Sequence, residues 1–510
     1  MKKLVAFLLV LALTLTSMAS CFAAEPVTLR VMLAIRDMDT LTDPSEMPAL
    51  VALEERTGVK IDWEIVKASD FDTKINLAFL IPEEYPDIII TAQNTFNVEE
   101  YGVTQGLVIP LPDELTLQHM PNYAERLAGE TSDPRVALTA SDGQIYTIAE
   151  QISQDYNTDQ HFFLNKKWMD NLGITEMPAT IEDLTNVLIA FRDGDADGDG
   201  DAANEIPMQM TIKDWDGGLR FFLPLWGLPV GDKWIHITED EKIEFVPTTE
   251  NFRKAMETMN LWYKEGLMDP GVLSMDGNTH TSKLQEGNVG FFVAWRLTSM
   301  SRDVLEKDAV LYTPEYATLS RTLQLANDGA YITVTNKHVE ESLRWLDALM
   351  EKETMYSLYY GERDDNLTDH GWTYLEDGRI TTLVGNVSVK NYLDVNTLFF
   401  APSNWVAKNV LMASQYEEKA GYSRIYEEAG IVQENSNKLL TMLGLTSEQL
   451  ASAALVETDI NNAVYENIVK FITEGVTDDS WNAFVKMFDK MKVADYVKMY
   501  QDAADAYFAK

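Results

Sequence analysis

Five aspartates alternate with small residues from Asp193 to Asp201, in a stretch that reads Asp-Gly-Asp-Ala-Asp-Gly-Asp-Gly-Asp. Carboxylates at this density repel one another unless a cation neutralises them, and calcium takes about six to eight oxygen ligands. The glycines at 194, 198 and 200 permit the tight, positive-φ turns that wrap oxygens around one point. A solvated acidic turn is the alternative, but it would not require such regular spacing. We therefore expect a calcium site with a structural rather than a catalytic role.

The calcium loop does not follow regular EF-hand spacing in either of two registers. Counting from Asp193 places Asn204 at the twelfth position, where a bidentate glutamate is expected. Counting from Asp195 places Ile206 there instead. Both registers include the carboxylate of Glu205 near the end of the loop. We expect the last ligand to come from a shorter exit that is not helical.

The composition limits the partners of the chain. With 41 basic and 81 acidic residues, the formal net charge is −40, which argues against nucleic acid or an anionic membrane as a partner. Net charge does not fix the polarity of a cleft, so a neutral or an anionic small ligand is compatible with it. At 510 residues the chain is too long for one ordinary core, and it suggests two lobes of roughly 200 residues each.

The first 24 residues have the pattern of an export signal peptide. Lys2 and Lys3 precede an apolar run over residues 4–15, and small residues follow. Two processing routes compete. Residues 18–21 resemble a lipobox, after which Cys21 would carry a lipid, whereas residues 21–23 also fit the small-x-small rule of ordinary signal peptidase. In both cases we expect the protein outside the cytoplasm.

In the rest of the chain we expect neither a membrane-spanning segment nor a disulfide bond. Cys21 is the only cysteine, so we expect no disulfide, although the compartment would allow one. No second apolar run approaches the ~18 residues that span a bilayer. We expect a monomer whose membrane contact is limited to a lipid on Cys21.

Strands and helices alternate along residues 27–91. The pattern predicts strands at Val27–Leu33, Val59–Val66 and Pro86–Thr91, with helices at Ala49–Thr57 and Asp70–Phe79 between them. This alternation is typical of an α/β lobe with a mainly parallel sheet. In such sheets ligands lie beyond the carboxyl ends of the strands. Three polar residues at the end of the last strand are therefore candidate ligand contacts: Thr91, Gln93 and Asn94.

Helical and strand patterns continue to the end of the chain without a short-period repeat or a low-complexity linker. We therefore expect two interwoven lobes rather than two domains in line. Thr180 is a plausible N-cap of the helix that precedes the calcium loop. Helices are expected at 181–191, 252–263, 342–352 and from about 439 to 510, and residues 284–295 should form a helix end that turns into a strand.

Short motifs follow one another in a characteristic order: Tyr85-Pro-Asp-Ile-Ile89, Gly106-Leu-Val-Ile-Pro-Leu111, Asp142-Gly-Gln-Ile-Tyr146, Leu164-Asn-Lys-Lys-Trp168, Leu172-Gly-Ile174, Pro178-Ala-Thr180, Glu286-Gly-Asn-Val-Gly290 and Arg344-Trp-Leu-Asp347. With the Asp-rich loop, this order resembles the family 1 extracellular solute-binding proteins of ABC importers, in particular the long branch that captures oligosaccharides. The resemblance implies a type 2 periplasmic-binding fold, in which two α/β lobes joined by crossing strands close on a sugar. Its implied partners are a carbohydrate ligand and the transmembrane permease of an ABC importer.

The resemblance also implies lobe boundaries and a calcium ligand set. The N-terminal lobe would comprise residues 25–140 and about 325–380, and the C-terminal lobe residues 141–324 and about 381–510. The loop is one residue longer before Asn204 than the family pattern, in which aspartate usually holds that ligand position. The implied ligands are the side chains of Asp195, Asp197, Asp199, Asn204 and Glu205 and the backbone carbonyl of Asp201.

Aromatic residues supply further candidates for a sugar site, because tryptophan and tyrosine offer a flat apolar ring with a polar edge. Trp295 ends an apolar strand and precedes Arg296, in a segment that feeds the cleft in this family. Trp215 lies in a polar turn, where a core role is less expected. A core or capping role is the alternative for each aromatic candidate. The remaining candidates are Asp328 and Tyr331, after an expected crossover strand, and Trp372, which we expect at the surface.

Catalytic patterns are weak, and we expect the protein not to be an enzyme. The six histidines are scattered without a His-x-x-x-His pair for zinc. The sequence has no nucleophile elbow, phosphate-binding loop or dinucleotide-binding turn. A glycosidase carboxylate pair is defined by a separation in space, so a secreted carbohydrate-active enzyme is the main alternative. A calcium-stabilised adhesion module without a small-molecule site is a further one.

Overall fold

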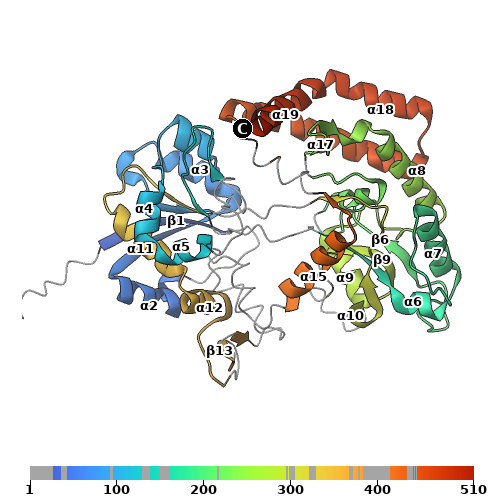
Figure 1. The fold of residues 1–510 in the computed structure, drawn as a ribbon, viewed down its shortest axis with the longest axis horizontal. Helices are drawn as coiled ribbons and strands as arrows, with labels where there is room; N and C mark the ends of the chain where they lie inside the picture. The colour runs from blue at the N-terminus through green and yellow to red at the C-terminus, as the bar shows by residue number, and fades with distance from the viewer. Residues whose placement is uncertain are drawn as a thin grey trace, which may run out of the picture.

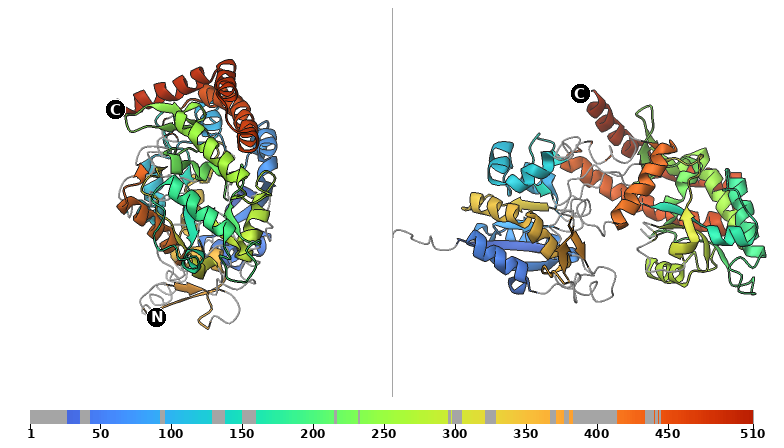
Figure 2. Two further views of the ribbon diagram at one scale, coloured as in Figure 1. Left: turned by 90° about the vertical axis from the view of Figure 1, so that its right-hand side faces the viewer. Right: turned by 60° about the horizontal axis from the view of Figure 1, so that its bottom comes forward.

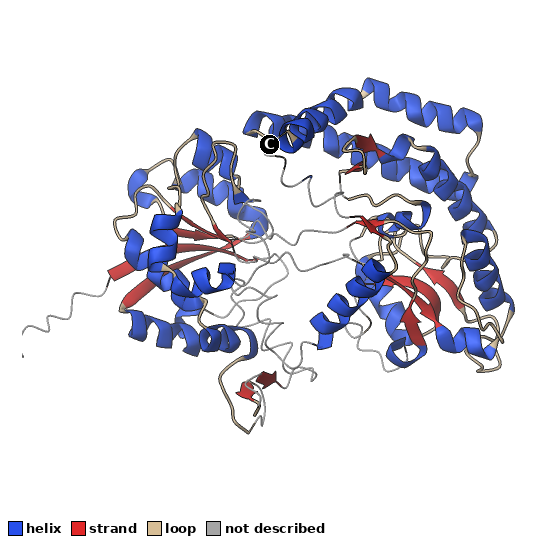
Figure 3. Ribbon diagram, in the orientation of Figure 1, coloured by secondary structure: helices blue, strands red, loops and turns tan. Residues whose placement is uncertain are grey.

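The fold is that of a computed structural model of the chain. It has two lobes, each built on its own β-sheet and surrounded by helices (Figure 1). Figure 3 distinguishes the two sheets from the helices that cover them. The structure describes residues 27–35, 43–91, 96–128, 138–149, 160–214, 217–231, 233–294, 297, 305–320, 329–366, 371–376, 380–382, 414–433, 440, 443 and 445–509.

The first lobe contains a five-stranded sheet with the order β2-β1-β3-β12-β4. Its first three strands are parallel, whereas β12 pairs antiparallel with both β3 and β4. The strand β1 is apolar along most of its length because helices bury both faces of the sheet. The strands are β1 (Val27–Ile35), β2 (Val59–Lys67), β3 (Ile88–Ile90), β4 (Ile148–Ala149) and β12 (Gly329–Ile332).

Alternate residues of β1 face two separate apolar cores. Val31 and Leu33 lie in one core, together with residues of α2, α5, α11 and α12, whereas Met32 and Ala34 lie in the other with α3 and η3. Helix α2 ends at Gly58, whose φ of 70° is the left-handed conformation common at helix ends. The helices are α2 (Pro48–Thr57), α3 (Ala68–Ala78), η3 (Glu99–Thr104), α4 (Asp113–His119), α5 (Pro121–Ala128), α11 (Val339–Leu349) and α12 (Lys352–Tyr360), with the short turns η1 (Pro44–Glu46) and η2 (Pro82–Glu84) and the hairpin β13 (Trp372–Tyr374) and β14 (Ile380–Thr382).

The second lobe contains a four-stranded sheet with the order β10-β5-β9-β6. The strand β9 is parallel to β6 and antiparallel to β5, so the carboxyl ends of β6 and β9 lie at one edge of the sheet. The strands are β5 (His161–Asn165), β6 (Ile206–Gln209), β9 (Val289–Ala294) and β10 (Ala309–Leu311). The same lobe holds the two-stranded sheets of β7 (Ile235–Ile237) with β8 (Ile243–Phe245), and β11 (Leu319–Ser320) with β15 (Val432–Gln433).

Helices from distant parts of the chain share the large core of the second lobe. Three C-terminal helices pack there beside α7 and α8, and the two views of Figure 2 show them along the outside of this lobe. The helices are α6 (Lys166–Asn171), α7 (Ile181–Asp193), α8 (Glu250–Lys264), α9 (Gly277–Glu286), α10 (Leu305–Asp308), α15 (Ser414–Glu428), α17 (Ser447–Glu474), α18 (Asp478–Lys490) and α19 (Val493–Phe508), with the turns η5 (Leu219–Phe221), η6 (Leu223–Trp226) and η7 (Val246–Thr248).

The observed elements confirm the predicted α/β class with two lobes. The expected strands and helices of residues 27–91 are present with shifts of one or two residues at their ends. The sheet is parallel only over β2, β1 and β3, because β12 enters it from much later in the chain and runs in the opposite direction. In the part of the chain that the structure describes, no helix has both the length and the apolar character needed to cross a bilayer.

Candidate calcium loop and ligand-binding residues

The calcium loop begins where α7 ends. Asp193 is the last residue of that helix, and its carboxylate accepts hydrogen bonds of 2.7 and 3.0 Å from the guanidinium of Arg192. These bonds also lower the pKa of the Asp193 carboxyl. Asp193 is thus engaged with Arg192 at the surface, which favours the register that starts at Asp195.

Glycine serves two different purposes in the loop. Gly198 and Gly200 have φ of 81° and 96°, as the positive-φ expectation requires. For Gly194 the expectation is wrong, because its φ is −108°. Glycine is needed there for space instead, since a Cβ would lie only 2.5 Å from Cδ2 of Leu172.

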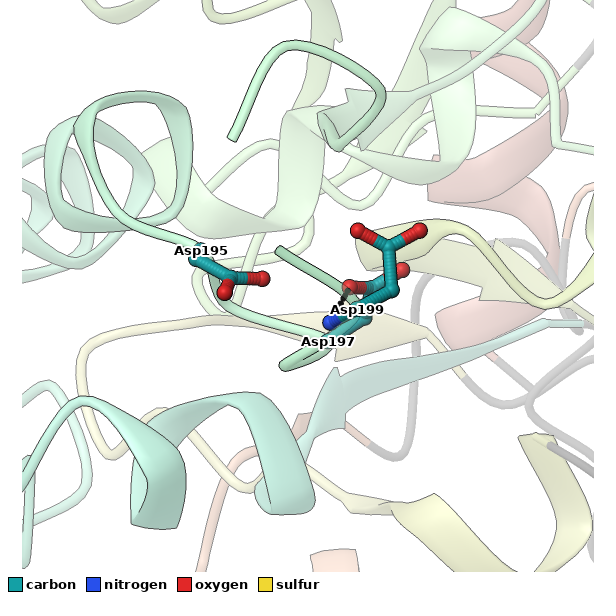
Figure 4. A group of neighbouring side chains, drawn as sticks. All are labelled: Asp195, Asp197 and Asp199. Atoms are coloured by element: carbon teal, nitrogen blue, oxygen red, sulfur yellow. Dashed lines mark hydrogen bonds between the residues drawn. The ribbon is translucent and has the colours of Figure 1, made fainter. Parts of the chain in front are cut away.

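The carboxylates of Asp195, Asp197 and Asp199 converge, and each offers an oxygen within 4.8 Å of the others (Figure 4). Backbone N–H groups hold them in place: Asp195 accepts from Gly198 and Gly200 at 3.0 Å each, and Asp197 accepts from the N–H of Asp199 at 2.9 Å. These bonds leave carboxylate lone pairs free for a cation. The loop therefore presents three preorganised anionic groups around one point.

Asn204 and Glu205 complete the same loop from its far end. Asn204 Nδ2 donates to Asp199 Oδ2 at 2.7 Å, and Glu205 Oε1 accepts from the N–H of Ala196 at 2.7 Å. Their other oxygens, Asn204 Oδ1 and Glu205 Oε2, are buried and have no hydrogen-bond partner among the described residues. An unsatisfied buried acceptor costs free energy, and a hard cation would satisfy both oxygens. The donor set therefore fits calcium.

Asp201 uses its side chain inside the loop. Its Oδ1 accepts from the N–H of Ala203 at 3.2 Å, and its carbonyl accepts a long bond of 3.4 Å from the N–H of Asn204. The carboxylate is thus occupied in a local turn, while the carbonyl oxygen retains a lone pair. This arrangement agrees with the implied role of the Asp201 carbonyl, rather than its carboxylate, as a ligand.

Thr91 lies at the carboxyl end of β3, as expected, but its side chain is 2% exposed. Its hydroxyl accepts a hydrogen bond of 3.1 Å from the N–H of Gly329 and lies 3.3 Å from the Gly329 carbonyl, to which it can donate. The residue therefore fastens the end of β3 to the start of β12. Six other predicted ligand contacts lie outside the described residues: Gln93, Asn94, Trp215, Trp295, Arg296 and Asp328.

Two aromatic candidates are buried. Tyr331 is 1% exposed and stacks on Phe96 at 4.1 Å between ring centroids, so its ring is part of the first-lobe core. Trp372 is also 1% exposed, which corrects the expectation of a surface aromatic. Its indole N–H donates to Ser357 at 3.3 Å, and its ring packs against Tyr356 of α12. Tyr331 was a candidate because it follows an expected crossover strand, whereas Trp372 was expected at the surface because Asp-His-Gly precedes it in the sequence.

A buried polar pair in the second lobe has no counterpart in the sequence predictions. Gln209, at the end of β6, donates from its amide Nε2 to the carbonyl of His280 on α9 at 3.2 Å. Both residues are 0% exposed. The remaining amide oxygen of Gln209 and both ring nitrogens of His280 have no hydrogen-bond partner in the described part of the chain. The only sequence signal was a glutamine that interrupts the apolar run of residues 206–210.

Two α/β lobes around separate sheets, with an acidic loop between a helix and a strand of the second, form the architecture expected of a solute-binding protein. The bacterial extracellular solute-binding protein family matches residues 39–356, and the chain belongs to this family.

The chain is similar to two characterised proteins over most of its length. The fructooligosaccharide ABC transporter substrate-binding protein FusA of Streptococcus pneumoniae is 25% identical over 95% of this chain and 91% of its own length. The lipoprotein LipO of Bacillus subtilis is 24% identical over 70% of each chain. Both similarities extend well beyond the calcium loop.

Solved structures share the fold. FusA in complex with kestose has a TM-score of 0.75 at 24% identity and covers 94% of this chain and 99% of its own. An EF-hand mutant of FusA in complex with fructo-nystose has the same TM-score of 0.75 at 23% identity, with 94% and 99% coverage. A human-milk-oligosaccharide solute-binding protein from Bifidobacterium longum infantis also scores 0.75, at 18% identity with 95% and 99% coverage.

Proposed function

We propose that this protein is the substrate-binding component of an ABC importer and captures an oligosaccharide outside the cytoplasm. The observation that carries the proposal is the similarity to FusA, a substrate-binding protein for fructooligosaccharides, over 95% of the chain. The relation to a lipoprotein supports a lipid on Cys21 as the link to the membrane. The permease of the importer would be the second partner.

Capture would proceed by closure of the two lobes around the sugar. We place the first lobe at residues 27–149 and 329–382, because β4 and β12 both belong to the first sheet. The second lobe would comprise residues 160–320 and 414–509, which contain the second sheet and the C-terminal helices. Compared with the sequence-based boundaries, the first lobe thus gains residues 141–149. The proposed sugar site lies beyond the carboxyl ends of β3, β6 and β9.

We further propose that the loop of the second lobe binds calcium. The side chains of Asp195, Asp197, Asp199, Asn204 and Glu205 and the carbonyl of Asp201 would hold it. Bound calcium would neutralise the carboxylates and satisfy the buried oxygens of Asn204 and Glu205. The loop joins α7 to β6, so the expected role of the metal is to fix this connection rather than to contact the sugar.

A panel of oligosaccharides tests the proposal. The panel is screened by thermal shift and contains neutral fructans such as kestose, milk oligosaccharides and acidic uronate oligosaccharides. A ligand that binds only the folded state stabilises that state by about 4 kcal/mol at 1,000 times its Kd. A hit is then titrated by calorimetry, and the incubated sugar is analysed by chromatography. Saturable binding of an intact sugar supports the proposal. Cleavage products would assign an enzyme instead, and failure of every sugar to bind would overturn the carbohydrate assignment.

A further inference from the structure

The chain segment after β6 is held at both ends by backbone contacts. The N–H of Thr211 donates to the carbonyl of Gly217 at 2.9 Å, and Thr211 also forms a parallel bridge with Gly218. These contacts close a loop from Thr211 to Gly218, of which the structure describes residues 211–214 and 217–218. The loop begins at the carboxyl end of β6, on the edge of the second sheet where ligands bind in α/β proteins.

The imidazole of His280 lies directly beneath the closing end of this loop. A Cβ built on Gly217 would lie 2.4 Å from His280 Nε2 and 2.5 Å from Cε1, so the backbone at this position rests on the ring. Only glycine fits, because Gly217 also has a φ of 65°. The ring is fully buried, and Gln209 of β6 fixes the helix that carries it through the carbonyl of His280.

We propose that His280 is a positioning residue, which supports Gly217 and thereby fixes the contact of Thr211 with Gly217 and Gly218 at the sugar-binding edge of the second lobe. The proposal rests on the proposed function for its consequence in sugar affinity, but the support of the loop is measurable without a sugar. His280 would not touch the ligand. It would act through the backbone of Gly217, so its effect should depend on the size and charge of the ring.

Burial opposes the protonated form of the His280 ring more strongly than the negative charge of Asp269 favours it. Asp269 is paired with Lys283 of α9 at 2.5 Å and also accepts from the N–H of Gly271, so it is already engaged. Asp276 caps α9, and Asp214 lies near Gly277 at the start of that helix.

Burial lowers the pKa of His280 to about 4, so the ring is neutral at pH 7. Protonation would add one N–H donor and a positive charge to a fully buried ring, and burial disfavours that charge. We therefore expect acid to displace the ring from beneath Gly217 and to loosen the loop.

A pair of glycine variants separates the contact from ordinary backbone strain. Gly217→Ala adds a methyl group that collides with His280, whereas Gly266→Ala adds one at a similar φ of 67° in open space. Because overpacking displaces the groups that collide, we expect Gly217→Ala to speed hydrogen exchange of the Thr211 amide by about tenfold and to weaken kestose binding by about tenfold. Gly266→Ala should leave both within about twofold.

Removal of the His280 ring should restore what Gly217→Ala loses. In the double variant Gly217→Ala/His280→Ala the new methyl group has room, and we expect most of the lost Thr211 protection and kestose affinity to return. The affinity of the wild type for kestose should fall below about pH 5, and this fall should be absent in His280→Ala. A purely structural role of His280 would not produce this difference in pH dependence. The variants are purified as full-length folded protein, and circular dichroism confirms folding.

The outcomes separate the support of Gly217 by His280 from the effect of this support on sugar binding. Equal exchange rates in Gly217→Ala and Gly266→Ala, or no recovery in the double variant, would overturn the support of the loop by His280. Altered exchange with unchanged kestose affinity would overturn its role in sugar binding. If the wild type binds neither kestose nor any other sugar of the panel, the proposed function fails, and the exchange measurements alone still decide whether His280 holds the loop.

Discussion

Asn204 and Asp199 are joined by a hydrogen bond of 2.7 Å from the amide Nδ2 to the carboxylate, and the amide oxygen of Asn204 is buried without a hydrogen-bond partner among the described residues. The amide thus donates to one ligand candidate and keeps its oxygen available for a cation. An aspartate at position 204 would place a second negative charge against Asp199. The asparagine thus retains an oxygen ligand and reduces repulsion in a loop that already carries several carboxylates.

Calcium removal should lower thermal stability without abolishing sugar binding. If calcium is present at 100 times its Kd, its binding contributes about 2.7 kcal/mol, which corresponds to a fall of roughly 5–10 °C in Tm on chelation. Scanning calorimetry with and without EGTA measures the shift. Asp195→Asn should abolish the response to EGTA, whereas Asp193→Asn should retain it because Asp193 pairs with Arg192. Complete loss of sugar affinity in a folded, calcium-free protein would place the metal in the sugar site.

Stability should fall with acid through His280. Burial lowers its pKa from the ordinary value of 6.5 to about 4, so the unfolded chain takes up the proton first as the pH falls. The contribution is complete above about pH 6.5 and is lost progressively towards pH 4, by roughly 3 kcal/mol in total. Urea unfolding of wild type and His280→Gln at several pH values measures the difference. A difference that does not change between pH 7 and pH 4.5 would contradict the prediction.

Glu457 should be the main polar contributor to the docking of the C-terminal helix. One of its carboxylate oxygens accepts from Lys233 at 2.7 Å and from the hydroxyls of Tyr496 and Tyr500 at 3.0 and 3.2 Å. We expect Glu457→Ala to cost about 2–4 kcal/mol, because it removes the carboxylate that accepts from three donors of a partly buried network. Among these donors, the hydroxyl of Tyr496 also has the carbonyl of Lys233 as a second acceptor. The exposed pair of Lys498 and Asp502 gives a control, since Lys498→Ala should cost less than about 0.5 kcal/mol. Urea unfolding measures both values.

The hydroxyl of Thr91 should matter more than its methyl group. Thr91→Val keeps the shape but removes the hydroxyl that binds the Gly329 backbone, and we expect a cost of about 1–3 kcal/mol. Thr91→Ser keeps the hydroxyl and should retain most of the stability. Thermal unfolding of the two variants checks the order. Equal stability of Thr91→Val and wild type would show that the hydroxyl does not fasten β12 to β3.

Much of the local structure follows from the residue pattern, because local periodicity and caps determine it. The predicted N-cap Thr180 is confirmed, since its hydroxyl accepts from the N–H of Asp183 at 3.1 Å. The helix end and strand predicted over 284–295 appear as the end of α9 and as β9. Each of these depends on residues within one turn or one strand.

The site was harder to predict because its residues meet through distant parts of the chain. The partner of Thr91 is Gly329, which is 238 positions away, and no local pattern indicates this pairing. Trp372 has polar neighbours in sequence, but α12 buries it. The support of Gly217 by His280 depends on the packing of α9 under a loop, which hydrophobic periodicity does not reveal.

The position of β12 has a consequence for how the exported chain folds. The central strand β3 needs residues 329–332 as its second neighbour, whereas all four strands of the second sheet lie between residues 161 and 311. During synthesis, which begins at the amino terminus, the first sheet stays open at β3 until all four strands of the second sheet have been made. We infer that the amino-terminal lobe, although made first, acquires its full sheet last, and that factors shielding β3 during this interval would limit misfolding.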